Sequence, residues 1–197
     1  MCHIRHTLDS TTTTTIATAL VHSSLDYCNY LYHGLPITQI KRLQHTQNGH
    51  SRAVTRTPKH SHISPVLKCL HWLKVEQRIQ YKIIFITHNL LHITEPKYLH
   101  RLINIKPLSR TRSSDHLCLS LPPVSTRLRC ADRSFRNSSP RLWNSLSINL
   151  RSFAPDTHHS ITVISYTPSH PCRALSLSRN QFLSCLKTHL FTLSYPS

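Results

Sequence analysis

The chain has 197 residues, enough for one or two domains, and 39% of them are hydrophobic, below the roughly 45–50% of typical globular domains. Only two glycines occur, Gly34 and Gly49, and no GxGxxG or GxxxxGK string is present, which argues against dinucleotide-binding and P-loop folds. Lysine and arginine number 24 against seven acidic residues, for a net charge of +17. Such a balance favours a polyanionic partner, above all nucleic acid. No apolar run is long enough for a membrane span or a signal peptide, so an intracellular protein is expected, with nucleus and cytoplasm both open.

Cysteine and histidine are abundant, with seven and 17 residues, but their spacing is not that of a metal site. The sequence has no pair of CxxC knuckles and no HExxH, the patterns that bring zinc ligands together. Reduced thiols and scattered surface histidines are therefore the preferred interpretation, and a structural zinc ion is the lesser alternative. No metal, cofactor or small-molecule substrate is predicted.

The first helical stretch is expected over about residues 12–32, where apolar side chains recur at steps of three and four. Gly34 and Pro36 then end one helix and begin the next. In this second helix Ile37, Ile40 and Leu43 share one face, and the opposite face carries Lys41, Arg42 and, further on, Arg52 and Arg56.

Two further helices complete a predicted bundle. Ser64 and Pro65 form a cap and first-turn pair for a short helix that runs through Leu70. The strongest helical pattern covers about residues 75–92, with a single apolar stripe. These four segments are long enough to bury one another as a small α-helical bundle over residues 1–100.

The sequence changes character after residue 100. Residues 105–177 hold most of the prolines and many serines, and we predict for 101–177 a loop-rich, basic, partly disordered tail. Two local exceptions are expected within it: a short strand from the alternating leucines at 117, 119 and 121, and a small apolar cluster that includes Phe135, Leu142 and Trp143.

A final amphipathic helix is predicted over residues 178–193. Ser178 and Gln181 have the spacing of a capping box, in which each side chain satisfies a backbone amide at the start of a helix. Phe182, Leu186 and Leu190 follow at helical spacing.

No catalytic constellation is found. Metal-dependent phosphoryl transfer needs clustered carboxylates, but no two acidic residues lie within three positions of one another. The seven acidic residues are Asp9, Asp26, Glu76, Glu95, Asp115, Asp132 and Asp156. Serine, cysteine and histidine are too common for a nucleophilic triad to be recognised, and no GxSxG elbow occurs. The chain is not expected to be an enzyme.

A resemblance to a known family adds to this interpretation. Five separated strings carry it in register: SSLDYCNYLYHGLP (23–36), IKRLQHTQN (40–48), RAVTRTPKHSHISPVLKCLHWLKVEQRIQYKI (52–83), SPRLWNSL (139–146) and LKTHLF (186–191). Together they resemble the C-terminal part of a LINE-type, non-LTR retrotransposon reverse transcriptase of the Jockey-like group. The resemblance implies that residues 1–100 are thumb-like, with helices that touch the template-primer backbone. It also implies that the palm, with its paired aspartates, and the endonuclease lie outside this sequence.

The chain departs from the family pattern at several places. Where the family has a QNAAAR-like stretch of small residues, this chain has Gly49 among polar residues, and the second helix is expected to break there. Lys74 stands where a proline is usual. Residues 155–177 have no counterpart in the family and are interpreted as an insertion or as a shifted reading frame in degenerate sequence. Such changes are typical of a decayed copy of a mobile element.

The sequence therefore predicts a non-catalytic remnant that binds RNA or DNA backbone weakly and without sequence preference. Seven cations are predicted to contact phosphates: Lys41, Arg42, Arg52, Arg56, Lys59, Arg78 and Lys82. The alternative for each is an ordinary exposed charge on a helix. Trp72 and Tyr81 could stack on bases, but for Trp72 a core role is preferred. The main alternative is a decayed copy with no selected function and a largely unfolded product. Self-association is left open.

Overall fold

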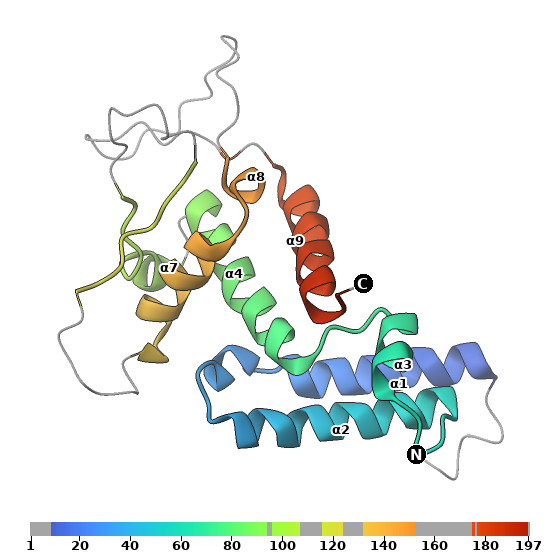
Figure 1. Ribbon diagram of the computed structural model, residues 1–197. Coiled ribbons are helices and arrows are strands. Elements are labelled where there is room, and N and C mark those ends of the chain that lie inside the picture. The colour runs from blue at the N-terminus through green and yellow to red at the C-terminus, as the bar shows by residue number, and fades with distance from the viewer. Residues whose placement is uncertain are drawn as a thin grey trace. The chain divides into compact units, whose positions relative to one another are not determined.

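The computed structural model describes residues 9–93, 96–106, 116–123, 132–152, 175 and 177–196. The chain forms two compact units: unit 1 comprises Met1–Ile83 with Lys187–Ser197, and unit 2 comprises Ile84–Leu186 (Figure 1). These units cut across the predicted regions 1–100, 101–177 and 178–193, whose boundaries stay a prediction.

The described residues are mainly helical, as predicted, and include the expected C-terminal helix. In chain order the helices are α1 (Ser10–Asp26), the 3-10 helix η1 (Asn29–Tyr32), α2 (Ile37–Thr55), α3 (Ile63–Cys69), α4 (Val75–Ile93), α5 (Lys97–His100), α7 (Phe135–Ser145), α8 (Ile148–Arg151) and α9 (Arg179–Ser194). Over these same stretches no strand is formed, and the predicted strand at 117–121 is wrong. Only isolated bridges are present there, one of which joins Ile105 to Leu119.

In unit 1, α1 begins at a side-chain cap and ends earlier than expected. The backbone amide of Thr12 donates to Asp9 Oδ1 at 3.1 Å, which satisfies one of the amides that a helix start leaves unpaired. The helix stops at Asp26 and not near residue 32, because Cys28 adopts a left-handed conformation with φ of 51°. The chain then continues as η1 and returns as α2, which lies alongside α1 (Figure 1).

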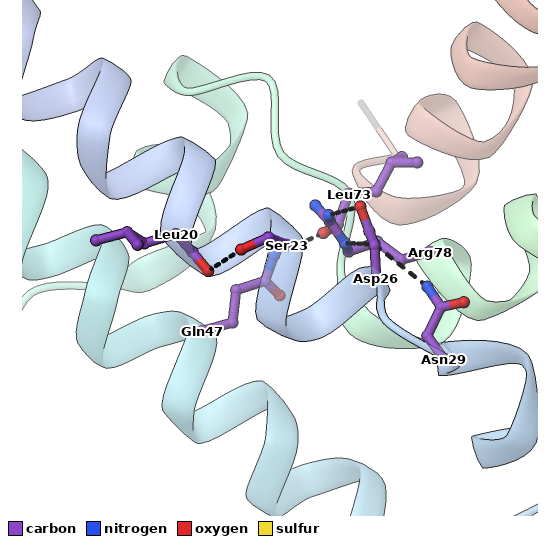
Figure 2. Close-up of polar contacts among 7 residues, drawn as sticks. All are labelled: Leu20, Ser23, Asp26, Asn29, Gln47, Leu73 and Arg78. Atoms are coloured by element: carbon purple, nitrogen blue, oxygen red, sulfur yellow. Dashed lines mark hydrogen bonds and ion pairs between the residues drawn. The ribbon is translucent and has the colours of Figure 1, made fainter.

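Helix α2 runs unbroken through Gly49, so the expected break is wrong. A glycine inside a helix costs about 1 kcal/mol relative to alanine, but the opposite face of α2 is anchored by packing. Gln47 and Ser51 are fully buried there. The Gln47 side-chain amide donates to the Leu73 carbonyl at 2.8 Å, which fixes α2 to the segment that leads into α4 (Figure 2).

Helix α3 begins one residue before the predicted cap. His62 occupies the cap position, so that Ser64 and Pro65 both lie within the first turn. Proline is tolerated there because first-turn amides have no intrahelical partner.

The apolar core of unit 1 gathers side chains distant in sequence. Val54, Leu67, Trp72 and Tyr195 are buried together. The Tyr195 hydroxyl donates to the Trp72 carbonyl at 2.8 Å, and this bond ties the end of α9 to the core. Burial raises the pKa of Tyr195 to about 12, so the hydroxyl remains a donor at neutral pH.

Unit 2 is built around Trp143, the anchor of the predicted apolar cluster. Trp143 and Phe182 are both fully buried, with ring centroids 5.9 Å apart. The Trp143 indole donates to the Leu117 carbonyl at 3.0 Å. The side chain of Asn144 both accepts from the Leu119 amide and donates to its carbonyl. The segment around residues 117–119 is thus held by these side chains and by backbone hydrogen bonds on both sides, from the Leu117 amide to the Arg151 carbonyl at 2.8 Å and from the Lys106 amide to the Cys118 carbonyl at 2.9 Å.

The expectation of a loop-rich 101–177 region needs correction where α7 and α8 form. Residues 135–145 have few periodic apolar positions, but burial of Ser138, Ser139 and Pro140 shows that small side chains form the packed face of α7. The predicted insertion at 155–177 and the disorder predicted there lie almost wholly outside the described residues.

The predicted capping box at the start of α9 is confirmed. The Ser178 amide donates to Gln181 Oε1 at 3.1 Å, and the Gln181 amide donates back to Ser178 Oγ at 3.4 Å. Phe182, Leu186 and Leu190 are buried along the helix, as the spacing indicates.

Candidate nucleic-acid interface

The three lysine and arginine residues of α2, together with His45 and the C-cap residue Arg56, share one side of the helix, whereas His50 lies away from it. At about 100° per residue, all five fall within a sector of about 100°. We call this sector, with the helix-ending Arg56, the basic face: Lys41, Arg42, His45, Arg52 and Arg56. Gln47, Ser51 and Val54, the buried residues of α2, lie on the opposite side. The same packing that anchors α2 therefore turns its cations toward solvent.

Four of these five side chains are exposed: Lys41, Arg42, His45 and Arg56. Arg52 is half-buried, and its Nη2 donates to the Ser61 carbonyl at 3.1 Å. This bond holds the loop that follows α2 against the basic face. The loop adds the exposed Lys59, together with the exposed His60 and His62.

Negative charge is missing from the surrounding sequence. No aspartate or glutamate occurs between Tyr27 and Val75, a stretch that contains the whole of α2 and α3. In the portions of the chain that the structure describes, the only two ion pairs join Arg78 to Asp26 and Arg141 to Asp132. The cations of the basic face thus have no carboxylate partner among the described residues, and their field is directed outward.

Two of the predicted contact residues lie on α4 instead. Arg78 is 8% exposed, and its guanidinium makes a two-pronged bond with Asp26, with Nε to Oδ1 at 3.1 Å and Nη2 to Oδ2 at 2.6 Å (Figure 2). Asn29 donates to the same carboxylate at 3.2 Å. Arg78 therefore links α1 and α4 inside unit 1, and we leave it out of the basic face. Lys82 is half-buried on the same helix.

The two aromatic candidates for base stacking differ in exposure. Trp72 is 3% exposed and belongs to the core, as preferred from the sequence. Tyr81 is half-buried, and its pKa is raised by burial and by the negative charge of Asp26. Neither ring lies open beside the basic face.

The sequence already grouped Lys41, Arg42, Arg52 and Arg56 on the face of the second helix opposite its apolar residues. His45 has the same helical spacing but was not included in that group. The Arg78–Asp26 pair, 52 residues apart, has no local signature.

Within the described part of the chain, no three histidine, cysteine, aspartate or glutamate side chains gather closely enough to hold a metal ion. Nor does any described helix combine the length and apolar character that crossing a membrane requires.

No protein-family model, curated protein or solved structure matches this chain, so the function has to be argued from its own residues.

Proposed function

We propose that the chain is a non-catalytic nucleic-acid-binding protein that holds the phosphate backbone of RNA or DNA through the basic face of α2, without reading base identity. The observation that carries the proposal is the convergence of Lys41, Arg42, Arg52 and Arg56 on the side of α2 opposite its buried residues. The resemblance to a retrotransposon reverse transcriptase thumb supports the same role, with the chain as a remnant of that enzyme.

Binding of this kind has a defined thermodynamic form. Cations that neutralise phosphates release condensed counterions, so the logarithm of the binding constant falls linearly with the logarithm of salt concentration. Lys41, Arg42, Arg56 and Lys59 are exposed and available for such contacts, and four contacts would give a slope of about −3.6 on duplex DNA. Non-specific affinities of this class are weak, with Kd on the order of 10⁻⁴–10⁻⁶ M.

The test removes charge from the basic face. The triple variant Lys41→Gln/Arg42→Gln/Arg56→Gln should weaken binding to a mixed-sequence duplex more than tenfold and reduce the salt slope by about 2.7, at 0.9 per contact. Fluorescence anisotropy of a labelled oligonucleotide between 50 and 200 mM salt measures both quantities.

A matched control separates local contact from overall charge. Lys97, Arg101 and Lys106 are also exposed but lie in unit 2, and their replacement by glutamine removes the same three charges. This control should retain most of the salt slope. Equal losses in the two variants would contradict the proposal, and a random-coil circular dichroism spectrum of the unmodified chain would favour the unfolded alternative.

A further inference from the structure

The basic face and the loop after it carry exposed histidines among their lysines and arginines. On α2, His45 lies near the centre of the cation sector, one turn after Lys41 and Arg42, and it is exposed. His60 and His62 are exposed in the loop that follows the helix. We call His45, His60 and His62 the surface histidines.

The loop that carries two of them is fixed to the end of the basic face. Ser61 lies between His60 and His62, and its carbonyl accepts the hydrogen bond from Arg52 Nη2 at 3.1 Å. The Ser61 amide donates to the Pro58 carbonyl at 3.2 Å, which closes a tight turn. His60 and His62 are therefore held beside the last turn of α2, next to the phosphate contacts proposed there.

The side chains of the surface histidines are not used by the fold. Among the described residues, none of the three takes part in a side-chain hydrogen bond, an ion pair or a ring contact. His62 occupies the cap position of α3 but makes no side-chain cap bond. His50 differs from them, because it lies on another side of α2 and its Nδ1 is 2.8 Å from the Thr46 carbonyl. The surface histidines can thus turn both ring nitrogens toward a ligand.

The charged groups around the surface histidines are mostly positive. α2 and its loop contribute Lys41, Arg42, Arg52, Arg56 and Lys59. Of the two helices packed against α2, α3 adds Lys68 and the thiol of Cys69, and α1 with its cap residue adds two carboxylates. Both carboxylates are engaged elsewhere: Asp26 is bonded to Arg78, and Asp9 caps α1. No ion pair of the described residues joins a carboxylate to a surface histidine.

A bound phosphate backbone would supply the anions that this surface lacks. Histidine changes its charge between about pH 5 and 8, and a nearby anion favours its charged form. The charged imidazole donates from both ring nitrogens, whereas the neutral ring donates from only one. A histidine that is neutral beside these cations therefore gains a proton when a phosphate comes into contact with it.

We infer that His45, His60 and His62 are further phosphate-binding residues of this surface and take up protons as the nucleic-acid backbone binds. The inference rests on the proposed function and adds to it regulation by pH. Because binding consumes protons, the affinity rises as the pH falls. At pH 7.5 the contacts of lysine and arginine remain, and at pH 5.5 three further contacts would steepen the salt slope by up to about 2.7, at 0.9 per contact.

The test removes the surface histidines and compares two pH values. The unmodified chain should bind a mixed-sequence duplex more than about tenfold more tightly at pH 5.5 than at pH 7.5, measured by fluorescence anisotropy. In the triple variant His45→Gln/His60→Gln/His62→Gln, this ratio should fall below about threefold, and the salt slope should be nearly the same at both pH values.

Two further variants act as controls for total histidine content and for folding. His50→Gln/His71→Gln/His189→Gln removes three histidines of unit 1 outside this surface and should keep the tenfold pH response. His45→Lys/His60→Lys/His62→Lys fixes the three charges, so it should bind at pH 7.5 as tightly as the unmodified chain does at pH 5.5. Circular dichroism at both pH values checks that the helix content is retained.

Proton uptake can also be measured directly. Calorimetric titration at pH 6.5, in two buffers that differ in ionisation enthalpy, gives the number of protons taken up per duplex bound. We expect at least about one for the unmodified chain and almost none for the glutamine variant.

The outcomes distinguish the inference from the function on which it rests. If the glutamine variant keeps the full pH response, or if the unmodified chain takes up no proton, the role of the surface histidines is overturned while salt-dependent phosphate binding stands. If no polyanion binds in a salt-dependent way at either pH, the proposed function itself fails.

Discussion

Units 1 and 2 each fully bury one large polar side chain, Gln47 in unit 1 and His88 in unit 2, but only Gln47 is hydrogen-bonded. In unit 1, Gln47 is bonded at both ends of its amide: it donates to the Leu73 carbonyl at 2.8 Å and accepts from Gln44 at 3.0 Å. In unit 2, His88 is equally buried, yet neither of its ring nitrogens has a hydrogen-bond partner. The first arrangement joins distant segments, whereas the second leaves a titratable group in an aromatic core.

The surroundings of His88 all disfavour its charged form. Its ring stacks on Phe182, with centroids 3.9 Å apart and planes 14° apart, and Trp143 lies 6.4 Å away. Burial lowers the pKa of His88 to about 3, with smaller contributions from the positive charges of His92 and Arg179. Burial lowers the pKa of His92 as well. The neutral amide of Gln47 does not titrate, so acid should destabilise unit 2 more than unit 1.

The largest effect is expected from acidification of unit 2. Unfolded His88 has an ordinary pKa near 6.5 and binds a proton there, whereas the folded form does so only near pH 3. The unfolded state therefore holds more protons between these values, and stability that is complete above pH 6.5 is lost as the pH falls. The loss attributable to His88 is roughly 3 kcal/mol between pH 7 and pH 4.

The two tryptophans allow each unit to be followed separately. Trp72 lies in unit 1 and Trp143 in unit 2, so ¹⁹F NMR of the 5-fluorotryptophan-labelled chain gives one reporter for each. On acidification, the Trp143 resonance should shift to its unfolded position first. His88→Leu should remove most of this acid sensitivity, whereas His60→Leu, at an exposed site in unit 1, should not. If the folded resonances of Trp72 and Trp143 disappeared at the same pH in every variant, the two units would not differ in acid stability and His88 would not be the cause.

A smaller effect is expected from the buried amide of unit 1. Gln47→Leu leaves the Leu73 carbonyl without its donor in a buried site, which costs about 1–2 kcal/mol. Urea titration followed at the Trp72 resonance measures this change. The exposed control Gln39→Leu should stay within about 0.5 kcal/mol of the unmodified chain. If Gln47→Leu left the free energy of unfolding unchanged, the hydrogen bond of Gln47 to Leu73 would add nothing beyond packing.

Local rules predicted local features, and long-range contacts decided the rest. The Ser178–Gln181 capping box and the helix near 75–92 followed from neighbouring residues and are confirmed. The continuity of α2 was missed because it depends on Leu73, 26 residues from Gln47. Helix α7 was missed because serine and proline at 138–140 are poor helix formers that only tertiary burial stabilises. Among the contact candidates, periodicity grouped the lysine and arginine residues of α2 on one face, but nothing local marks Arg78 as a partner of Asp26.

The smallest predicted effect concerns Gly49, where unit 1 tolerates a poor helix former on its exposed side. Gly49→Ala should stabilise unit 1 by about 0.5–1 kcal/mol, because alanine restricts the unfolded chain and its methyl group meets nothing within 4 Å. The urea midpoint of the Trp72 resonance should rise, and that of Trp143 should stay unchanged if the units unfold separately. Gly34, with φ of 68°, provides the opposite case: Gly34→Ala forces a side chain into the left-handed region and should destabilise the same unit. If Gly49→Ala instead destabilised unit 1, the backbone of α2 would be strained at this residue. The buried hydrogen bond of Gln47 to Leu73 would then have to offset that strain as well.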